Sequence, residues 1–133
     1  MIVVDASVVV TAVGAVGEHA EDVLRRIARE AACAPHLLDL EVVSALRQMH
    51  HRGLLAEAAA GRAMWHLASL RIRRFPHAHL IARCWELREN LTIYDASYVA
   101  LAELTGATLL TRDVGQTRAP GIRCEVELFA PAA

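Results

Sequence analysis

Hydrophobic positions along this chain fall into short continuous runs and into longer stretches with helical spacing. The run at residues 2–4 is β-branched and predicts a buried strand. A second apolar run at 108–111 and a third segment at 124–129 predict further strands. Residues 71–75 alternate arginine with apolar side chains, which predicts a short edge strand. Strand segments are therefore expected near both ends of the chain and in its middle.

The remaining hydrophobic positions recur three or four residues apart, which is the spacing of amphipathic helices. The helices predicted from this spacing cover residues 7–14, 20–31, 38–53, 56–70, 80–91 and 95–106. Gly14 and Gly17 mark the end of the first helix, and the last is apolar on most sides, as expected for a buried helix. Strands that alternate with helices predict an α/β fold with three α/β/α layers around a central, mostly parallel sheet.

The composition fits one compact domain over residues 1–133 and excludes several other classes. At 55% hydrophobic, the chain can bury a sizeable interior, and 133 residues leave little room for a second core. Fourteen basic and fifteen acidic residues give a formal charge of −1, so a strongly basic field for gripping nucleic acid is absent. All fourteen basic residues are arginine, and without lysine the chain cannot form a Walker-type phosphate loop.

The cysteines and the N-terminal residues predict a cytoplasmic protein. Cys33, Cys84 and Cys124 are odd in number and far apart, which predicts neither a disulfide framework nor a zinc knuckle. The first residues are apolar, but they lack a basic leader and contain Asp5, so a signal peptide is not predicted. No apolar stretch is long enough to span a bilayer, and no membrane association is expected.

Four acidic residues are candidates for a shared site. Asp5 and Asp113 stand at or just beyond the ends of predicted central strands, and the carboxyl ends of parallel strands lie at one edge of a sheet. Asp95 begins a buried helix, so its side chain can reach the same edge. Glu41 follows Leu38 by three residues, at the border of its helix's apolar face. These positions predict that Asp5, Glu41, Asp95 and Asp113 converge.

Each of these acids also has a purely structural interpretation. Asp5 and Asp95 could be helix N-caps, Glu41 could be a solvated residue beside the core, and Asp113 could close a surface turn. Four converging carboxylates, however, raise one another's pKa and lower stability unless a cation offsets their charge. A set of oxygen ligands without Cys or His suits Mg²⁺ or Mn²⁺, and such an ion supports hydrolysis of a phosphodiester.

Two hydroxyl groups lie close to these acids in the sequence. Ser7 and Thr111 are candidates for contacts to water or phosphate, and capping of backbone groups is the alternative for both. Elsewhere, His77-x-His79 and His50-His51 are interpreted as surface histidines, because no cysteine or carboxylate has suitable ligand spacing. Arg71, Arg73 and Arg74 could form a stripe for an RNA backbone, or could be the solvated charges of an edge strand.

Several segments resemble a known family. VVDASVVV, HLLDLEVVSALR, TIYDASYVALAELTGATLLT and TRD are similar, in their order and spacing, to PIN-domain ribonucleases, and most similar to the VapC toxins of VapB–VapC toxin–antitoxin pairs. The resemblance runs from the first strand to beyond Asp113. It implies a parallel-sheet endoribonuclease that uses Mg²⁺ or Mn²⁺, held by acids that match Asp5, Glu41, Asp95 and Asp113. It also implies an RNA substrate, a homodimer and a cognate VapB-like antitoxin that occupies the site.

The chain departs from the family pattern at one place. Some members carry another acid just beyond the fourth, whereas Gly115 and Gln116 stand here. The number of bound metal ions, one or two, is therefore not predicted. Two other functions are alternatives. A phosphoryl-transfer domain with an aspartyl nucleophile is disfavoured, because Ser7 stands where the dehalogenase-like pattern has a second acid. A catalytically silent module that captures arginine in the acidic pocket would also use all four acids.

Overall fold

The computed structural model describes residues 1–14 and 18–129, and in these ranges five strands form one sheet. All four strand pairings are parallel, and the strand order is β3-β2-β1-β4-β5. The strands are β1 (Ile2–Val4), β2 (Ala32–Pro35), β3 (Ile72–Phe75), β4 (Thr108–Thr111) and β5 (Val126–Leu128). The predicted parallel sheet is confirmed, and β3 is an edge strand as the alternating pattern indicated.

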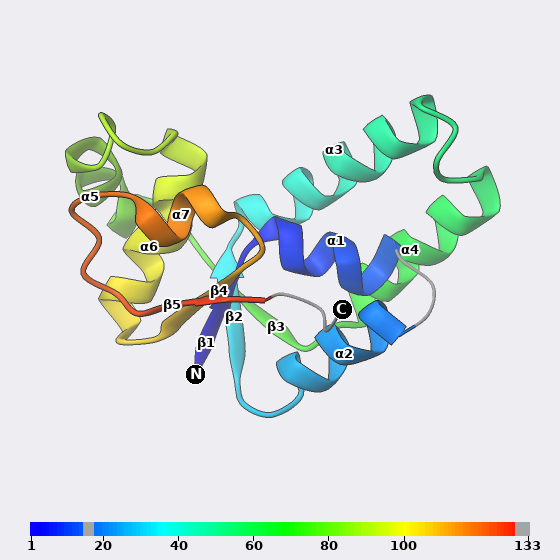
Figure 1. The fold of residues 1–133 in the computed structure, drawn as a ribbon, viewed down its shortest axis with the longest axis horizontal. Helices are drawn as coiled ribbons and strands as arrows, with labels where there is room; N and C mark the ends of the chain where they lie inside the picture. Colours follow the sequence, from blue (N-terminus) through cyan, green and yellow to red (C-terminus); the bar gives the residue numbers. More distant parts are fainter. Residues whose placement is uncertain (15–17, 130–133) are drawn as a thin grey trace.

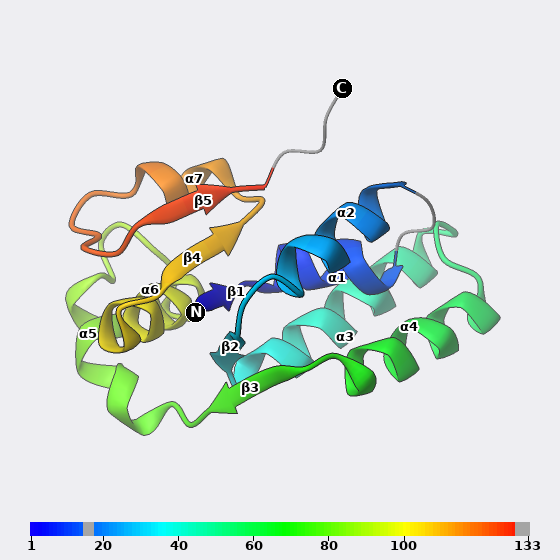
Figure 2. The same cartoon turned by 90° about the horizontal axis from the view of Figure 1, so that it is seen from below.

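Helices cover the sheet on both sides. In both views, α5 and α6 lie on one side of the sheet and α1 to α4 on the other (Figures 1 and 2). The helices are α1 (Ala6–Gly14), α2 (Glu18–Ile27), α3 (Leu37–His51), α4 (Glu57–Ser69), the 3-10 helix η1 (Ala78–Leu80), α5 (Ile81–Glu86), α6 (Ile93–Thr105) and α7 (Val114–Arg118). This arrangement confirms the three-layer α/β/α fold. No helix within the described ranges is both long and apolar enough to cross a membrane.

The strand order creates a switch point between β1 and β4. From β1 the chain builds β2 and β3 on one side of the sheet, and it later adds β4 and β5 on the other side. Loops that leave the carboxyl ends of β1 and β4 therefore run in opposite directions and leave a crevice between them. Asp5 follows β1 and Asp113 follows β4, so both lie where an open parallel sheet usually binds its ligand.

Helix α6 is the buried helix that its all-round apolar sequence predicted. Its residues from Ala96 to Ala102 are buried without interruption, and the helix packs on β1, β2 and β4. Thr92 is its N-cap, and the Thr92 hydroxyl accepts a hydrogen bond from the Asp95 backbone N–H at 3.1 Å. The helix therefore begins before Asp95, and the interpretation of Asp95 as an N-cap is wrong.

Strand β2 and helix α7 were not predicted, and α2 and α5 are shorter than predicted. Strand β2 (Ala32–Pro35) was missed because its small residues continue the apolar spacing of α2, which ends at Ile27. Helix α7 (Val114–Arg118) was missed because its five residues are too few to show a hydrophobic repeat. Helix α5 ends at Glu86, because residues 87–90 form turns. Gly14 ends α1 as predicted, and Gly17 lies outside the described residues.

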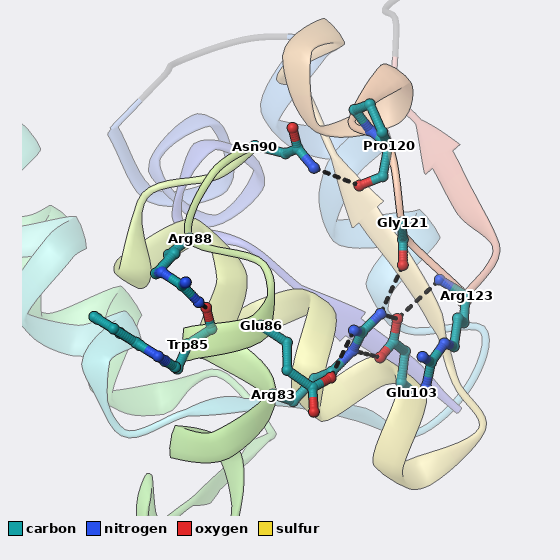
Figure 3. A network of polar contacts seen from close by, with 9 residues as sticks. All are labelled: Arg83, Trp85, Glu86, Arg88, Asn90, Glu103, Pro120, Gly121 and Arg123. Atoms are coloured by element: carbon teal, nitrogen blue, oxygen red, sulfur yellow. Dashed lines mark hydrogen bonds and ion pairs between the residues drawn. The ribbon is translucent and has the colours of Figure 1, made fainter.

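An ion pair joins α5 and α6 to the segment that leads into β5 (Figure 3). Arg83 donates to both carboxylate oxygens of Glu103, at 2.7 and 3.1 Å, and to the Gly121 carbonyl at 2.6 Å. Glu103 also accepts from the Arg123 backbone N–H at 2.8 Å. Burial acts to raise the pKa of Glu103, but the Arg83 and Arg123 hydrogen bonds outweigh it and hold the pKa below its ordinary value. This cluster fixes the edge of the sheet beside β4.

Candidate active site

Asp5 is the most deeply buried acid of the chain's described part. Its exposed fraction is 3%, and it stands between the end of β1 and the first turn of α1. One carboxylate oxygen, Oδ1, accepts from the Val8 backbone N–H at 3.2 Å, so Asp5 does cap α1 as the structural interpretation proposed. The same oxygen accepts from the Ser7 hydroxyl at 2.5 Å, and Oδ2 accepts from the Thr111 hydroxyl. Capping therefore uses only part of this carboxylate.

Ser7 and Thr111 hold Asp5 against the loop that follows β4. The Thr111 hydroxyl donates to Asp5 and accepts from the Asp113 backbone N–H at 2.9 Å. The Ser7 hydroxyl likewise donates to Asp5 and accepts from the Arg112 backbone N–H at 3.0 Å. Both hydroxyl hydrogens are thus already bound to Asp5, and both residues fix its orientation. A contact from either residue to water or phosphate would have to use the oxygen lone pairs or a rotated hydroxyl.

Glu41 reaches the site from the second turn of α3. Its Oε1 atom accepts from the Tyr98 hydroxyl at 2.7 Å, and Tyr98 is buried on α6 one turn beyond Asp95. Helix α3 begins at Leu37. The Leu37 backbone N–H donates to the ring nitrogen Nε2 of His77, in the loop after β3, at 2.9 Å. Glu41 is half-buried, so it is not the solvated residue of the alternative interpretation. Its second oxygen, Oε2, makes no hydrogen bond among the described residues.

Asp95 and Asp113 complete the group from α6 and from the loop after β4. Asp95 is half-buried in the first turn of α6. Asp113 is exposed, and its Oδ1 atom accepts from the Gly115 backbone N–H at 2.8 Å, which makes it the N-cap of α7. The turn-closing interpretation of Asp113 is therefore correct for its Oδ1 atom.

The pKa values show that the four acids act on one another. Burial raises the pKa of Asp5, and hydrogen bonds from Ser7, Thr111 and the backbone only partly offset it. Burial also raises the pKa of Glu41, and the charges of Asp95 and Asp5 raise it further. For Asp95, burial is again the main cause and the charge of Asp113 adds to it. Repulsion thus acts on Glu41 from Asp5 and Asp95, and on Asp95 from Asp113.

Gln116 is a further residue of this region that sequence reasoning did not select. It is 3% exposed, and its backbone N–H donates to the Asp113 carbonyl at 3.2 Å. Its side chain donates toward Asp95, which acts to lower the pKa of that acid. The side-chain oxygen Oε1 is buried without a partner. Burial of an unpaired carbonyl typically lowers the free energy of unfolding by about 1–3 kcal/mol.

Some of these partners carried a signal in the sequence. Tyr98 follows Asp95 by three residues, which places both side chains on the same face of a helix. Gln116 follows Asp113 by three residues and would lie on that face only if α7 were recognised. Among the other candidates, His77 and His79 are exposed as predicted. Arg74 is bound to Asp39 at 2.8 Å, so it is not a free cation for an RNA backbone.

The donors of the site fit a hard divalent cation. They are the carboxylate oxygens of the four acids, and no cysteine thiol or histidine ring stands among them in the described residues. In residues 1–14 and 18–129, no three acids, histidines or cysteines are already close enough to form a ligand set for one ion. To hold Mg²⁺ or Mn²⁺, the side chains of Asp5, Glu41, Asp95 and Asp113 would have to move closer together than they are here.

Comparison with known proteins identifies the family. Residues 2–122 match the PIN domain. The chain belongs to the PIN-domain family. Ribonuclease VapC1 of Mycobacterium tuberculosis is 44% identical over 128 residues, covering 95% of this chain and 96% of that protein. Ribonuclease VapC9 of the same organism is 41% identical over 125 residues, covering 90% and 95%. The resemblance to VapC-like PIN-domain proteins is thus confirmed over most of the chain.

A known structure supports the same assignment. PAE2754 from Pyrobaculum aerophilum superimposes with a TM-score of 0.65 and 28% sequence identity, covering 86% of this PIN-domain chain and 81% of that chain. The PIN-like fold predicted from the sequence is therefore confirmed by an independent structure. The fold alone does not define an activity, which depends on the residues of the acidic site.

Proposed function

We propose that this PIN-domain protein is an endoribonuclease that hydrolyses RNA phosphodiester bonds with Mg²⁺ or Mn²⁺ and acts as the toxin of a toxin–antitoxin pair. The observation that carries the proposal is the set of four mutually repelling acids, supplied by β1, α3, α6 and the loop after β4. Its relatives at 44% and 41% identity are named VapC ribonucleases, which supports RNA as the substrate. The free cysteines Cys33, Cys84 and Cys124 fit action in a reducing cytoplasm.

The residues of the site have distinct tasks in such a reaction. A bound divalent cation would polarise a phosphate oxygen of the RNA and lower the pKa of a water molecule bound to it. Asp5 is held in place from both of its oxygens by Ser7 and Thr111, so its position does not depend on the ligand. Tyr98 holds the Oε1 atom of Glu41, which leaves Oε2 for a ligand. Asp95 and Asp113 add the remaining negative charge of the proposed site.

The first prediction concerns the metal. Purified protein is expected to cleave RNA with Mg²⁺ or Mn²⁺ and to stop when a chelator is in excess, because carboxylate oxygens suit a hard cation and the Ser7 and Thr111 hydroxyls are already bound to Asp5. The measurement is the appearance of new RNA ends, mapped by primer extension with and without chelator. Undiminished cleavage in excess chelator contradicts the proposal. A protein that cleaves no RNA with either metal would instead favour the silent module that captures arginine from a partner.

A cognate VapB-like antitoxin is the second partner that we propose. A hollow of about 510 Å³ opens next to Glu41 and is lined by Leu37, Leu40, Ser44, Ala45, Gln48 and Tyr94. This surface suits a segment that places apolar side chains in the hollow and an arginine on the Glu41 carboxylate. Titration of the antitoxin encoded beside this protein is expected to inhibit cleavage in proportion to binding. Saturated binding with full activity contradicts inhibition by occupancy of the site.

We also propose that the protein is a homodimer, and an apolar surface supports this. A hollow of about 430 Å³ is lined by Leu37, His77, Leu80, Ile81, Cys84, Trp85, Ile93, Tyr94 and Ser97. Trp85 is 62% exposed there, and exposed aromatic side chains around an apolar hollow are typical of protein interfaces. The hollow shares Leu37 and Tyr94 with the one beside Glu41. A partner subunit bound here would therefore lie next to the acidic site.

Light scattering tests the dimer. The wild-type protein is expected at twice the chain mass of 14.5 kDa, and Trp85→Arg is expected to shift it to a single chain. Trp65→Arg is the matched control, because Trp65 is 70% exposed on α4 and does not line the hollow. A wild-type protein that stays at the mass of one chain at high concentration contradicts the dimer. A dimer that survives Trp85→Arg removes this surface from the interface.

A further inference from the structure

Arg112 is an exposed arginine that is held at the edge of the sheet where the strands end. Its Nη1 atom donates to the Thr11 hydroxyl oxygen of α1 at 2.5 Å, and its backbone N–H donates to the Ser7 hydroxyl at 3.0 Å. The Thr11 hydroxyl donates in turn to the Ser7 carbonyl at 3.1 Å, and the Ser7 hydroxyl donates to Asp5. A chain of hydrogen bonds therefore connects the guanidinium group to the most deeply buried acid.

The side chain of Arg112 joins the two parts of the chain that separate at the switch point. It starts in the loop after β4 and reaches α1, the helix that follows β1. Thr11 lies four residues beyond Ser7 on the same face of α1, which is a rise of about 6 Å along the helix. The guanidinium group is therefore held beside the crevice, about one helical turn from the residue that contacts Asp5.

The charge of Arg112 is not neutralised by an acid in the part of the chain that the structure describes. Arg74 and Arg83 form ion pairs with acids there, whereas Arg112 forms none. A guanidinium group carries five N–H donors, and the hydrogen bond to Thr11 uses one of them. Because the side chain is exposed, the remaining donors are available to a ligand. Arginine donors in this fork geometry suit the oxygens of a phosphate group.

We propose that Arg112 binds a phosphate group of the RNA substrate and so holds the strand next to the acidic site. This inference rests on the proposed ribonuclease function. The chain has a formal charge of −1, so no strongly basic surface draws RNA toward the four acids. A single arginine fixed beside them supplies an attraction for the backbone at the place where it is needed. The acids are then left to the divalent cation, and Arg112 is a binding residue for the substrate.

The test is kcat/KM for cleavage of one single-stranded RNA at a fixed low Mg²⁺ concentration and a series of KCl concentrations. Arg112→Met keeps an unbranched apolar side chain without charge, and it is expected to lower kcat/KM about tenfold, mainly through a higher KM. Because one phosphate contact is lost, the plot of log kcat/KM against log salt is expected to be less steep by about 0.7. Arg112→Lys keeps the charge and is expected to keep the wild-type slope.

Two further variants separate a phosphate contact from a structural link. Thr11→Val removes the hydroxyl that holds the guanidinium group but leaves its charge, so it is expected to keep the wild-type slope. Arg29→Met is the matched control, because Arg29 is exposed in the loop that leads into β2, at the opposite edge of the sheet. It is expected to leave kcat/KM within about twofold of wild type, with an unchanged slope.

An unchanged slope in Arg112→Met shows that Arg112 contacts no phosphate and overturns the proposal, whether or not the rate falls. The proposal is also wrong if Thr11→Val lowers kcat/KM as much as Arg112→Met does with the same slope, because Arg112 then only ties the loop after β4 to α1. An unchanged slope for RNA together with weaker binding of the antitoxin assigns Arg112 to the protein partner instead. If the wild-type protein cleaves no RNA with Mg²⁺ or Mn²⁺, the proposed ribonuclease function itself fails.

Discussion

Replacement of Asp5 by asparagine is expected to lower RNA cleavage on the order of 10³-fold, since it removes charge from the best-fixed acid of the site. The amide keeps an oxygen for the hydrogen bonds from Ser7 and from the Val8 backbone, so the cap of α1 survives. Burial raises the pKa of Asp5, so ionised Asp5 lowers the free energy of unfolding at pH 7. The variant without divalent metal is therefore expected to be at least as stable as wild type.

Thermal melts and one cleavage assay separate this account from a purely structural cap. Added Mg²⁺ should raise the melting temperature of wild type, because a ligand that binds only the native state stabilises it, and should raise that of Asp5→Asn clearly less. Asp22→Asn is the matched control, because Asp22 pairs only with Arg25 at the surface of α2. An active Asp5→Asn enzyme with an unchanged response to Mg²⁺ would remove Asp5 from the proposed metal ligands.

Glu103→Gln is expected to lower the free energy of unfolding by about 2 kcal/mol at pH 7, which corresponds to several degrees of melting temperature. Glu103 accepts from Arg83 and from the Arg123 backbone N–H, and the Arg83 and Glu103 side chains are only 18% and 13% exposed (Figure 3). Glu86→Gln removes a second partner of the same arginine. Because Glu86 is 60% exposed, that change is expected to cost less than about 1 kcal/mol.

The effect of Glu103→Gln also has a defined pH dependence. The pKa of Glu103 is lowered in the folded protein, so its carboxylate adds stability that is complete above its ordinary value of 4.5. This stability is lost as the pH falls through the lower folded value. Chemical denaturation at a series of pH values should therefore show wild type and Glu103→Gln converging in acid. A difference that stays constant down to strongly acidic pH contradicts an ionic contribution.

The places of two candidate acids in the fold could be predicted because short parallel strands end next to them. Asp5 and Asp113 follow β1 and β4, which are adjacent and parallel, so their positions depend only on recognising two strands and the edge they share. The positions of Asp95 and Glu41 were predicted from the helical spacing of their neighbours alone. The helix start at Thr92 was missed by a few residues because a hydroxyl cap gives a weaker signal than the apolar repeat that follows it.

The partners of these acids depend on tertiary packing that the sequence pattern does not contain. Tyr98 meets Glu41 across 57 residues, and Thr111 meets Asp5 across 106 residues. Strand β2 was missed because Ala32, Cys33 and Ala34 lack the β-branched side chains that indicate a strand, and only its place between β1 and β3 defines it. The orphaned oxygen of Gln116 can be found only once the packing of α7 on β4 and β5 is known.

Diffraction from crystals soaked in Mn²⁺ tests the central claim most directly, through the anomalous scattering of the metal. The account predicts a peak between the carboxylates of Asp5, Glu41, Asp95 and Asp113, at ligand distances of about 2.2 Å from at least two of them. The same soak of Asp95→Asn should give a weaker peak or none. Crystals of active protein that show Mn²⁺ bound elsewhere, and no peak among these acids at saturating metal, would contradict the account.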